Sequence, residues 1–360
     1  MKGSDFCLNS LGYLGKIITK EKGREKREWM KIAIVKLSAL GDIIHAMIVL
    51  QFIKQAIPDS SIDWIVEERF ASVLEHNPHI STIHCVNLKS LKKEKIRFFA
   101  ELKKLKKYAK NSYDIVIDMQ GLLKSAIASK ILGPNVGFDK NSIREKIASA
   151  FYESSFFVPY SKNVILRNMD LITLALDIEI EKECLQNKDP FLFFAEEDTK
   201  KIDSFLVEDQ KTIVYILGSS WKSKIYPKEK FVEIINDLEG NHLLVWGSSE
   251  EKAYANYILE HSEAKIVPKM DLNELKALIS MADLVIGADS GPTHFAWALN
   301  RPSITIFGPT PSKRNVLETK INKVIDCEKK IDPLNLDKKD LCIQMINPEK
   351  IIVLAKELLK

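Results

Sequence analysis

The sequence contains no cysteine pattern typical of a metal centre or of a disulfide framework. Structural zinc sites and small disulfide-stabilised domains both depend on closely paired cysteines. Here the five cysteines are scattered over 360 residues, with no Cys-x-x-Cys pair: Cys7, Cys85, Cys184, Cys327 and Cys342. This usage argues against a zinc site and agrees with a protein of the reducing cytoplasm.

Long apolar runs are missing too. No segment approaches the ~20 apolar residues that a helix needs to span a bilayer. Residues 1–29 do not make a convincing signal peptide, because Asp5 and Asn9 interrupt their apolar part and no clear cleavage site follows. We therefore expect a cytoplasmic protein in which residues 1–29 are an extension outside the fold and Met30 stands at its start.

The glycine-rich fingerprint of dinucleotide-binding domains, Gly-x-Gly-x-x-Gly, is also absent. The loop after the first apolar run reads KLSALGD, from Lys36 to Asp42, and holds the single glycine Gly41. An NAD-dependent oxidoreductase therefore loses its best support.

The net charge is a modest +4, but it is unevenly distributed. Residues 89–110 carry ten Lys or Arg against two Glu, a local charge of +8. Ile96, Phe99, Leu102 and Leu105 recur there at helical spacing, which predicts a basic amphipathic helix over residues 91–110. This helix has either a solvated face or a surface that meets anionic lipid headgroups or an anionic acceptor. No nucleic-acid module accompanies the charge, so nucleic acid is not expected as a partner.

Short apolar runs alternate with longer amphipathic stretches, which is typical of a parallel sheet covered by helices on both faces. In the first half we expect strands at 32–37, 62–66, 83–86 and 115–118, and helices at 43–56, 69–76, 91–110 and 122–131. The pattern changes after Ala148, and a second series follows. Its strands are expected at 212–217, 242–246, 264–267, 284–286 and 303–307, and its helices at 228–238, 250–260, 272–282 and 294–299.

The fold class expected from this alternation is α/β, with two doubly wound, Rossmann-like domains facing a central cleft. Ligands of such folds bind at the carboxyl ends of the strands. We expect the two domains at residues 30–185 and 186–345, and a C-terminal helix at 346–360.

Polar segments after the predicted strands bring residues suited to catalysis or phosphate binding to this cleft. Asp42 is either the N-cap of the next helix or a general base at the end of a central strand. Ser219, Ser220 and Lys224 either form a polar loop or bind phosphate oxygens. Glu250 is either a partner of a helix dipole or a ligand for ribose hydroxyls.

A further segment, residues 284–310, reads LVIGADSGPTHFAWALNRPSITIFGPT and predicts a strand, a sharp turn, a helix and a second strand. Such a unit presents backbone N–H groups at a helix N-terminus, where a phosphate can bind. We expect Asp289 to cap that helix and hold the turn, because its carboxylate would repel a diphosphate. Ser290 and Gly291 then offer N–H groups to phosphate. His294 either donates to a leaving diphosphate or is a structural histidine.

From Met30 onward the chain resembles the bacterial lipopolysaccharide heptosyltransferases of glycosyltransferase family nine. MKIAIVKLSALGDIIHA, at 30–46, is similar to the family's opening strand and loop. IDMQGLLKSAIAS, at 117–129, is similar to its Asp-x-Gln-Gly-Leu-x-Lys-Ser segment. VPKMDLNELKALISMADLVIGADSGPTHFAWAL, with the later FGPT, is similar to its nucleotide-sugar region. The number and order of these segments make the resemblance strong.

The resemblance implies a GT-B fold in which the N-terminal half binds the acceptor and the C-terminal half binds ADP-L-glycero-D-manno-heptose. On the donor side it implies roles in binding phosphate, ribose, adenine or heptose for Ser219, Ser220, Lys224, Glu250, Met270, Asp289, Ser290, Gly291 and His294. On the acceptor side it implies a catalytic base and acceptor contacts at Asp42, Gln120, Lys124, Arg144 and Arg167.

The resemblance also implies an inverting transfer of heptose to the Kdo of Kdo-lipid A, at the cytoplasmic face of the inner membrane. No cofactor is expected, since the chain has no Asp-x-Asp pair of the kind that holds a metal in other glycosyltransferases. Lys224, the N–H groups of Ser290 and Gly291, and the helix dipole are expected to stabilise the departing ADP.

Two alternatives stay open. Ser290 stands where members that add the first heptose commonly have threonine, and it is shared with members that add the second. The chain is therefore also consistent with an enzyme that acts on a heptose acceptor. The other alternative is a nucleotide-sugar-binding protein without transferase activity, which would need no base facing the cleft.

Overall fold

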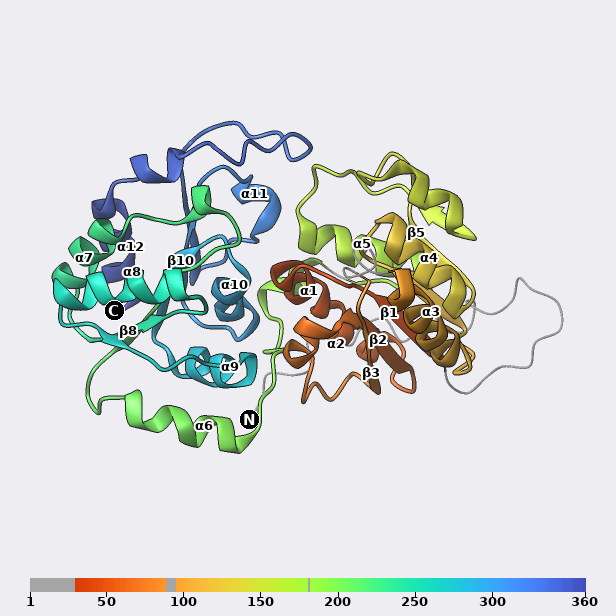
Figure 1. The fold of residues 1–360 in the computed structure, drawn as a ribbon, viewed down its shortest axis with the longest axis horizontal. Helices are drawn as coiled ribbons and strands as arrows, with labels where there is room; N and C mark the ends of the chain where they lie inside the picture. Colours follow the sequence, from red (N-terminus) through yellow and green to blue (C-terminus); the bar gives the residue numbers. More distant parts are fainter. Residues whose placement is uncertain (1–29, 89–94, 181) are drawn as a thin grey trace.

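The computed structural model describes residues 30–88, 95–180 and 182–360. The expected extension, residues 1–29, and the start of the basic segment, residues 89–94, lie outside the described residues. The described chain forms two lobes, seen side by side in Figure 1. We call residues 30–176 the first lobe and residues 196–358 the second lobe.

Each lobe is built on a six-stranded sheet in which all pairs are parallel. The strands of the first lobe are β1 (Lys31–Val35), β2 (Ser61–Glu67), β3 (Thr82–Val86), β4 (Ile115–Asp118), β5 (Asn135–Phe138) and β6 (Ser154–Phe156). Those of the second are β7 (Thr212–Ile216), β8 (Asn241–Val245), β9 (Lys265–Ile266), β10 (Leu284–Ala288), β11 (Ser303–Phe307) and β12 (Asn322–Asp326).

The two sheets have the same topology. Their strand orders are β3-β2-β1-β4-β5-β6 and β12-β11-β10-β7-β8-β9. Numbered within its own lobe, each sheet has the order 3-2-1-4-5-6, which is that of doubly wound nucleotide-binding folds. The predicted fold class is therefore confirmed.

Helices cover these sheets. The α-helices are α1 (Leu40–Met47), α2 (Val49–Ala56), α3 (Lys95–Ala109), α4 (Leu123–Leu132), α5 (Val164–Leu176), α6 (Glu196–Ile202), α7 (Lys228–Asp237), α8 (Ser249–Glu260), α9 (Leu272–Met281), α10 (Gly291–Ala298), α11 (Ser312–Asn315) and α12 (Pro348–Leu358). Short 3-10 helices add η1 (Glu68–Val73), η3 (Lys146–Phe151), η4 (Lys182–Gln186), η5 (Asp203–Phe205), η6 (Lys222–Lys224) and η7 (Cys342–Met345).

The apolar strands are buried on both faces, and alternate residues enter different cores. In β1, Ile32 belongs to one apolar cluster and Ala33 to another. In β7, Val214 belongs to the first of these clusters, and Tyr215 belongs to a third cluster. Ile32 and Val214 share one cluster, so the largest core runs continuously from one lobe into the other.

Several sequence predictions of secondary structure are wrong. Strands β5, β6 and β12 were not predicted, because they are short and mix polar residues or glycine with apolar ones. The predicted helix 43–56 is two helices, α1 and α2, separated at Ile48. The predicted helix 69–76 is the 3-10 helix η1, and the chain turns at His76, whose φ is +64°.

The basic helix exists as α3, but its apolar face is narrower than predicted. Leu105 is buried, whereas Phe99 is 72% exposed. Lys103, Lys106 and Lys107 are exposed along the same helix. Across the described ranges, no helix is both long enough and apolar enough to cross a bilayer.

The segment that connects the lobes is hydrogen-bonded to both of them. On the first lobe, the Asn77 side chain donates to the carbonyl oxygen of Phe191 at 3.1 Å. On the second, the backbone N–H of Phe191 donates to Ala298 at 3.1 Å. The Lys188 ammonium donates to the carbonyl oxygen of Trp297, at the end of α10, at 2.6 Å. The predicted domain boundary at residue 185 lies in this connection.

Lys188 provides a test of this connection. Burial lowers the pKa of the Lys188 ammonium to about 7. Between pH 7 and 10 the unfolded chain therefore binds more protons at this residue than the folded chain, and its contribution makes stability rise with pH. We expect the free energy of unfolding of Lys188→Met to rise less over pH 7.5–9.5 than that of the wild type, by about 1–2 kcal/mol. Urea unfolding of both proteins at pH 7.5 and pH 9.5 measures this change. An equal rise of the unfolding free energy in the two proteins would contradict the prediction.

Candidate active site

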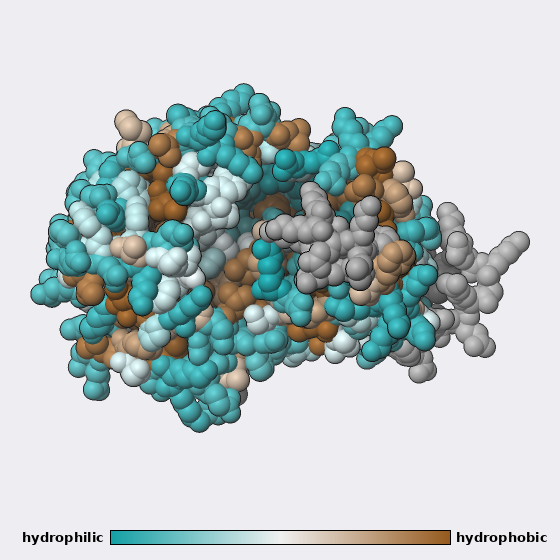
Figure 2. Space-filling view, in the orientation of Figure 1, coloured by the Kyte–Doolittle hydropathy of each residue, from teal (hydrophilic) through white to brown (hydrophobic). Residues whose placement is uncertain are grey.

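A cavity of about 900 Å³ opens between the lobes. It is bordered by the loops that follow β1 and β4 in the first lobe and β7 and β10 in the second. Each of these pairs is adjacent in its sheet, at the point where the strand order reverses and a doubly wound fold opens a crevice. The space-filling view shows the surface hollowed between the lobes, with hydrophilic side chains along the upper edge of the hollow (Figure 2).

The first turns of α1 and α10 meet where the two lobes touch at this cavity. A Cβ on Gly41 would lie 3.1 Å from Cδ2 of His294, and a Cβ on Gly291 would lie 2.6 Å from Cγ of Leu40. Glycine at these two positions lets the helices approach each other closely. The contact sets the side chains of α1 opposite those of α10.

This contact predicts the effect of adding one methyl group. In Gly291→Ala the new Cβ would displace Leu40, and overpacking of this kind destabilises by about 1–3 kcal/mol. We expect a lower free energy of unfolding together with lower activity, because α1 is pushed away from α10. Denaturant unfolding and an activity assay measure the two effects. The control for the free energy of unfolding is Gly247→Ala, whose Cβ would make only an ordinary 3.5 Å contact with Glu251.

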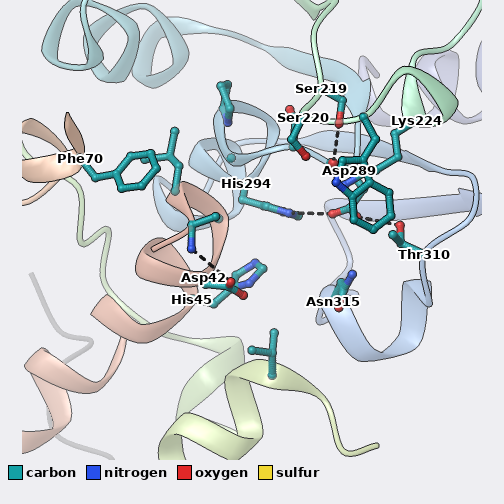
Figure 3. A pocket seen from close by; sticks show the side chains of 18 of the residues that line it. Asp42, His45, Phe70, Ser219, Ser220, Lys224, Asp289, His294, Thr310 and Asn315 are labelled. Atoms are coloured by element: carbon teal, nitrogen blue, oxygen red, sulfur yellow. Dashed lines mark hydrogen bonds and ion pairs between the residues drawn. The ribbon is translucent and has the colours of Figure 1, made fainter. Parts of the chain in front are cut away.

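Asp42 lies on α1 beside this contact and borders the cavity. The N-cap of α1 is Ala39, so the interpretation of Asp42 as an N-cap is wrong. As the third residue of the helix, Asp42 instead accepts the backbone N–H of Ala39 through Oδ2 at 3.3 Å. Figure 3 shows Asp42 and His45 on one helix, facing the part of the site that carries His294.

Asp289, which follows β10, is the centre of a buried network. Its Oδ2 lies 2.8 Å from the Lys224 ammonium and accepts the Thr310 hydroxyl at 2.8 Å. Its Oδ1 lies 3.2 Å from Nε2 of His294 (Figure 3). The Ser219 hydroxyl donates to its carbonyl oxygen at 3.2 Å. Two loops of the second lobe and helix α10 thus converge on one carboxylate.

Neighbouring side chains determine the protonation state of the Asp289 carboxylate. Burial by itself raises the pKa of Asp289, but the Lys224 ammonium and the hydrogen bond from His294 outweigh burial and hold this pKa well below its usual range. Asp289 is therefore an anion at neutral pH. Its carboxylate and the ammonium of Lys224 compensate each other inside the cavity wall.

The expected helix cap is one residue away from Asp289. Ser290 is the N-cap of α10, and the Asp289 carboxylate binds Lys224, His294 and Thr310 instead, so the prediction that Asp289 caps the helix is wrong. The prediction that it holds the turn agrees with these contacts. The first turn of α10 carries no acidic residue, so its N-terminus presents the positive end of the helix dipole to the cavity.

Two histidine rings, one from each lobe, are in contact at a tilt of 56°. The ring centroids of His45 and His294 are 4.4 Å apart. Burial, and then the neighbouring His294, hold the pKa of His45 well below its usual value. His45 is therefore neutral at pH 7.

The site and its surroundings match a known family. The model of glycosyltransferase family 9 (heptosyltransferase) matches residues 102–331. The chain belongs to glycosyltransferase family 9. It is therefore a glycosyltransferase, as the resemblance of its motifs implies.

Individual relatives extend the family 9 match to almost the whole chain. The chain is 43% identical over 344 residues to lipopolysaccharide heptosyltransferase 1 of Campylobacter coli, covering 91% of this chain and 99% of the relative. It is 29% identical to lipopolysaccharide heptosyltransferase 1 of Pseudomonas aeruginosa, with 78% and 79% covered. Among solved structures, E. coli heptosyltransferase WaaC with ADP-2-deoxy-2-fluoro heptose is 25% identical, with a TM-score of 0.72 and coverage of 91% and 99%.

The family 9 cavity gathers most of the side chains that the sequence singled out. The predicted residues that line it are Asp42, Gln120, Arg144, Arg167, Ser219, Ser220, Lys224, Met270, Asp289, Ser290, Gly291 and His294. The cavity therefore combines residues from both lobes.

Two predicted residues do not line this cavity. Lys124 of α4 forms an ion pair with the buried Glu67 at 3.0 Å, which ties α4 to the end of β2. Glu250 is exposed, whereas its neighbour Glu251 faces the cavity wall and accepts the N–H of Gly247 at 2.7 Å. Both glutamates lie in the first turn of α8, and successive side chains on a helix point in different directions.

Arg167 borders the cavity, but its guanidinium is committed to the protein backbone. Burial, and then the nearby Arg314, lower its pKa to about 10, so Arg167 stays charged at neutral pH. It donates at 2.7–3.2 Å to the carbonyl oxygens of Ser142, Val158 and Pro159. Arg144 is exposed where it lines the cavity, so its guanidinium is more accessible to an acceptor than that of Arg167.

Sequence reasoning missed several residues of this family 9 site. They are Lys36, His45, Trp221, Glu251, Thr310 and Arg314. Thr310 ends the Phe-Gly-Pro-Thr segment, whose glycine and proline after a strand are a turn signal. The others carry no local signal that distinguishes them from ordinary loop or helix residues.

Proposed function

We propose that this glycosyltransferase moves heptose from ADP-L-glycero-D-manno-heptose to the Kdo of Kdo-lipid A, with inversion at the anomeric carbon. The observation that carries the proposal is the meeting of Asp42, on the first lobe, with the α10 N-terminus and Lys224, on the second. Such a pair supplies a base on one side and anion-binding groups on the other. The near full-length likeness to lipopolysaccharide heptosyltransferase 1 supports heptose as the sugar.

The second lobe binds the donor in this proposal. The N-terminus of α10, at Ser290 and Gly291, faces the diphosphate with backbone N–H groups and a helix dipole. Lys224 and the hydroxyls of Ser219 and Ser220 lie in the same part of the cavity. Met270 borders the nucleoside, and Glu251 replaces Glu250 as the acidic residue that faces the cavity near it.

The first lobe binds the acceptor and removes its proton. The Asp42 carboxylate accepts the proton of a Kdo hydroxyl as that oxygen attacks the anomeric carbon of heptose. Negative charge then develops on the departing ADP, where the donor groups of α10 and Lys224 stabilise it. Gln120 and Arg144 border the acceptor side of the cavity.

The acceptor is a lipid, so the enzyme works at the cytoplasmic face of the inner membrane in this proposal. The exposed lysines of α3, together with the exposed Phe99 ring, support contact with anionic headgroups. The attraction is expected to weaken as salt is added, because exposed charges are screened.

A transfer assay tests the proposal. The enzyme is incubated with ADP-L-glycero-D-manno-heptose and either Kdo-lipid A or the same acceptor already carrying one heptose, and products are identified by mass. Heptose on Kdo-lipid A alone supports the proposal. Product only on the heptosylated acceptor favours the second-heptose alternative, to which Ser290 points. Donor binding without product on either acceptor favours a binding protein.

A further inference from the structure

The segment between β12 and η7, residues 328–341, borders the donor side of the cavity. Pro333 and Leu336 line the cavity. The Lys338 ammonium lies 4.6 Å from the ring centroid of Trp221, which lines the cavity as well. The family match ends at residue 331, so most of this segment is outside the part of the chain that the family model describes.

The two ends of this segment are held together, and each end carries a cysteine. Both cysteines are free thiols, and the Cys327 side chain is close enough to Cys342 to contribute to the raised pKa of the Cys342 thiol. Just inside them, the Lys329 ammonium lies 2.9 Å from Oδ2 of Asp340. Asp340 also accepts the backbone N–H of Cys342 at 2.9 Å. The thiols are thus brought together by the fold although the sequence separates them.

Gly308 places this thiol pair directly behind the donor loops. Its carbonyl oxygen accepts the Cys327 thiol at 3.4 Å. A Cβ on Gly308 would lie 2.9 Å from Cβ of Ile343 in η7 and 3.2 Å from the carbonyl oxygen of Ser223 in η6. Two residues further along, Thr310 donates to Asp289. Packed backbone therefore connects the thiols with the loops that hold Lys224 and Asp289.

We propose that Cys327 and Cys342 are a modification site, at which a low-molecular-weight disulfide converts the two thiols into an intramolecular disulfide that fixes segment 328–341 and perturbs donor binding. Cys327 is half-buried and Cys342 is 4% exposed, so the reagent enters at Cys327. Burial, and then the Cys327 thiol, raise the pKa of the Cys342 thiol, which therefore acts second.

The chemistry proceeds by two thiol–disulfide exchanges. The Cys327 thiol loses its proton, and the thiolate attacks one sulfur of the reagent, forming a mixed disulfide and releasing one small thiolate. The Cys342 thiol then loses its proton and attacks the Cys327 sulfur, releasing the second small thiolate. The protein loses two protons and two electrons, and one reagent disulfide becomes two thiols.

The first test uses oxidised glutathione and intact-protein mass. The reduced full-length protein is incubated with mixtures of oxidised and reduced glutathione, quenched, alkylated and digested. The expected product has lost two hydrogens and yields a peptide that links Cys327 to Cys342. Glutathione held on single cysteines with no such link, or a link that involves another cysteine, would overturn the assignment.

Variants separate this pair from the remaining cysteines. Cys85→Ser is expected to form the same link, whereas Cys327→Ser and Cys342→Ser are not. Cys327→Ser replaces the less buried member, so it keeps the test valid if the buried Cys342→Ser protein folds poorly. The Cys327–Cys342 disulfide can form whether or not the protein transfers heptose. A missing disulfide therefore contradicts this proposal alone and leaves the proposed function untouched.

A second measurement tests the effect on the donor site, and this part rests on the proposed function. ADP affinity is measured by calorimetry for the reduced and the linked protein, which requires no acceptor. We expect linking to weaken ADP binding by about fivefold or more, with recovery after treatment with dithiothreitol. Equal affinities in a protein shown to be fully linked would overturn the coupling to the donor loops.

Discussion

Replacing Asp42 by asparagine is expected to lower kcat for heptose transfer by about 10²- to 10⁴-fold, the usual contribution of a positioned general base. Asparagine has the shape of aspartate and keeps an oxygen that can accept the Ala39 N–H, so α1 retains its start. It cannot accept the acceptor's proton at neutral pH. Single-turnover and steady-state transfer assays measure the loss.

The same variant should bind ADP as the wild type does, because the donor groups lie on the other lobe. The matched control is Asp59→Asn, an exposed aspartate of the first lobe that does not line the cavity. It should leave kcat unchanged. If Asp42→Asn keeps more than a tenth of wild-type turnover, another residue is the base.

Replacing Lys224 by methionine is expected to affect both stability and donor use. The change removes one member of a buried ion pair, which costs about 3 kcal/mol when the remaining charge keeps few partners. His294 and Thr310 still bind Asp289, so the protein should fold. We expect kcat/KM for the donor to fall by about 10²-fold, because a cation beside the departing diphosphate is lost.

The pH dependence of stability and a control variant at a neighbouring lysine test this prediction. The lowered pKa of Asp289 means that the ion pair stabilises the fold fully above about pH 4, and that this contribution is lost as pH falls further. The difference in unfolding free energy between the wild type and Lys224→Met should therefore shrink below pH 4. The control Lys222→Met changes an exposed lysine two residues away and should behave as the wild type. A constant difference at all pH values would show that the ion pair is not its source.

The architecture and part of the site were predictable from local patterns, whereas Met270, Gln120, Arg144 and Arg167 were predicted only through the family resemblance. Alternating apolar runs and amphipathic stretches indicate a doubly wound fold, and polar loops after central strands must gather at one crevice. Asp42 and the segment from Asp289 to His294 were found in this way. Strand β12 was missed because its sequence, NKVID, mixes polar and apolar residues without a continuous buried run.

The errors within the site concern the direction in which side chains point and their contacts with residues that are distant in the sequence. Glu250 and Glu251 are adjacent on the first turn of α8, and no local pattern says which one faces the cavity. The carboxylate of Asp289 was assigned to its own helix, but its partners Lys224 and Thr310 come from loops far along the chain. Lys124 belongs to a well-matched motif, yet its nearest carboxylate, Glu67, is at the end of another strand.

The close contact of α1 with α10 has a mechanical consequence. Points near a pivot travel least, so if the lobes rotate about the place where Gly41 and Gly291 let them touch, Asp42 and Ser290 keep nearly constant separation. Pro333 and Leu336 also line the cavity but lie outside this contact, so they would move farther than Asp42 and Ser290 in such a rotation. Such a rotation would widen the entrance of the cavity for a bulky lipid while Asp42 and Ser290 keep their separation.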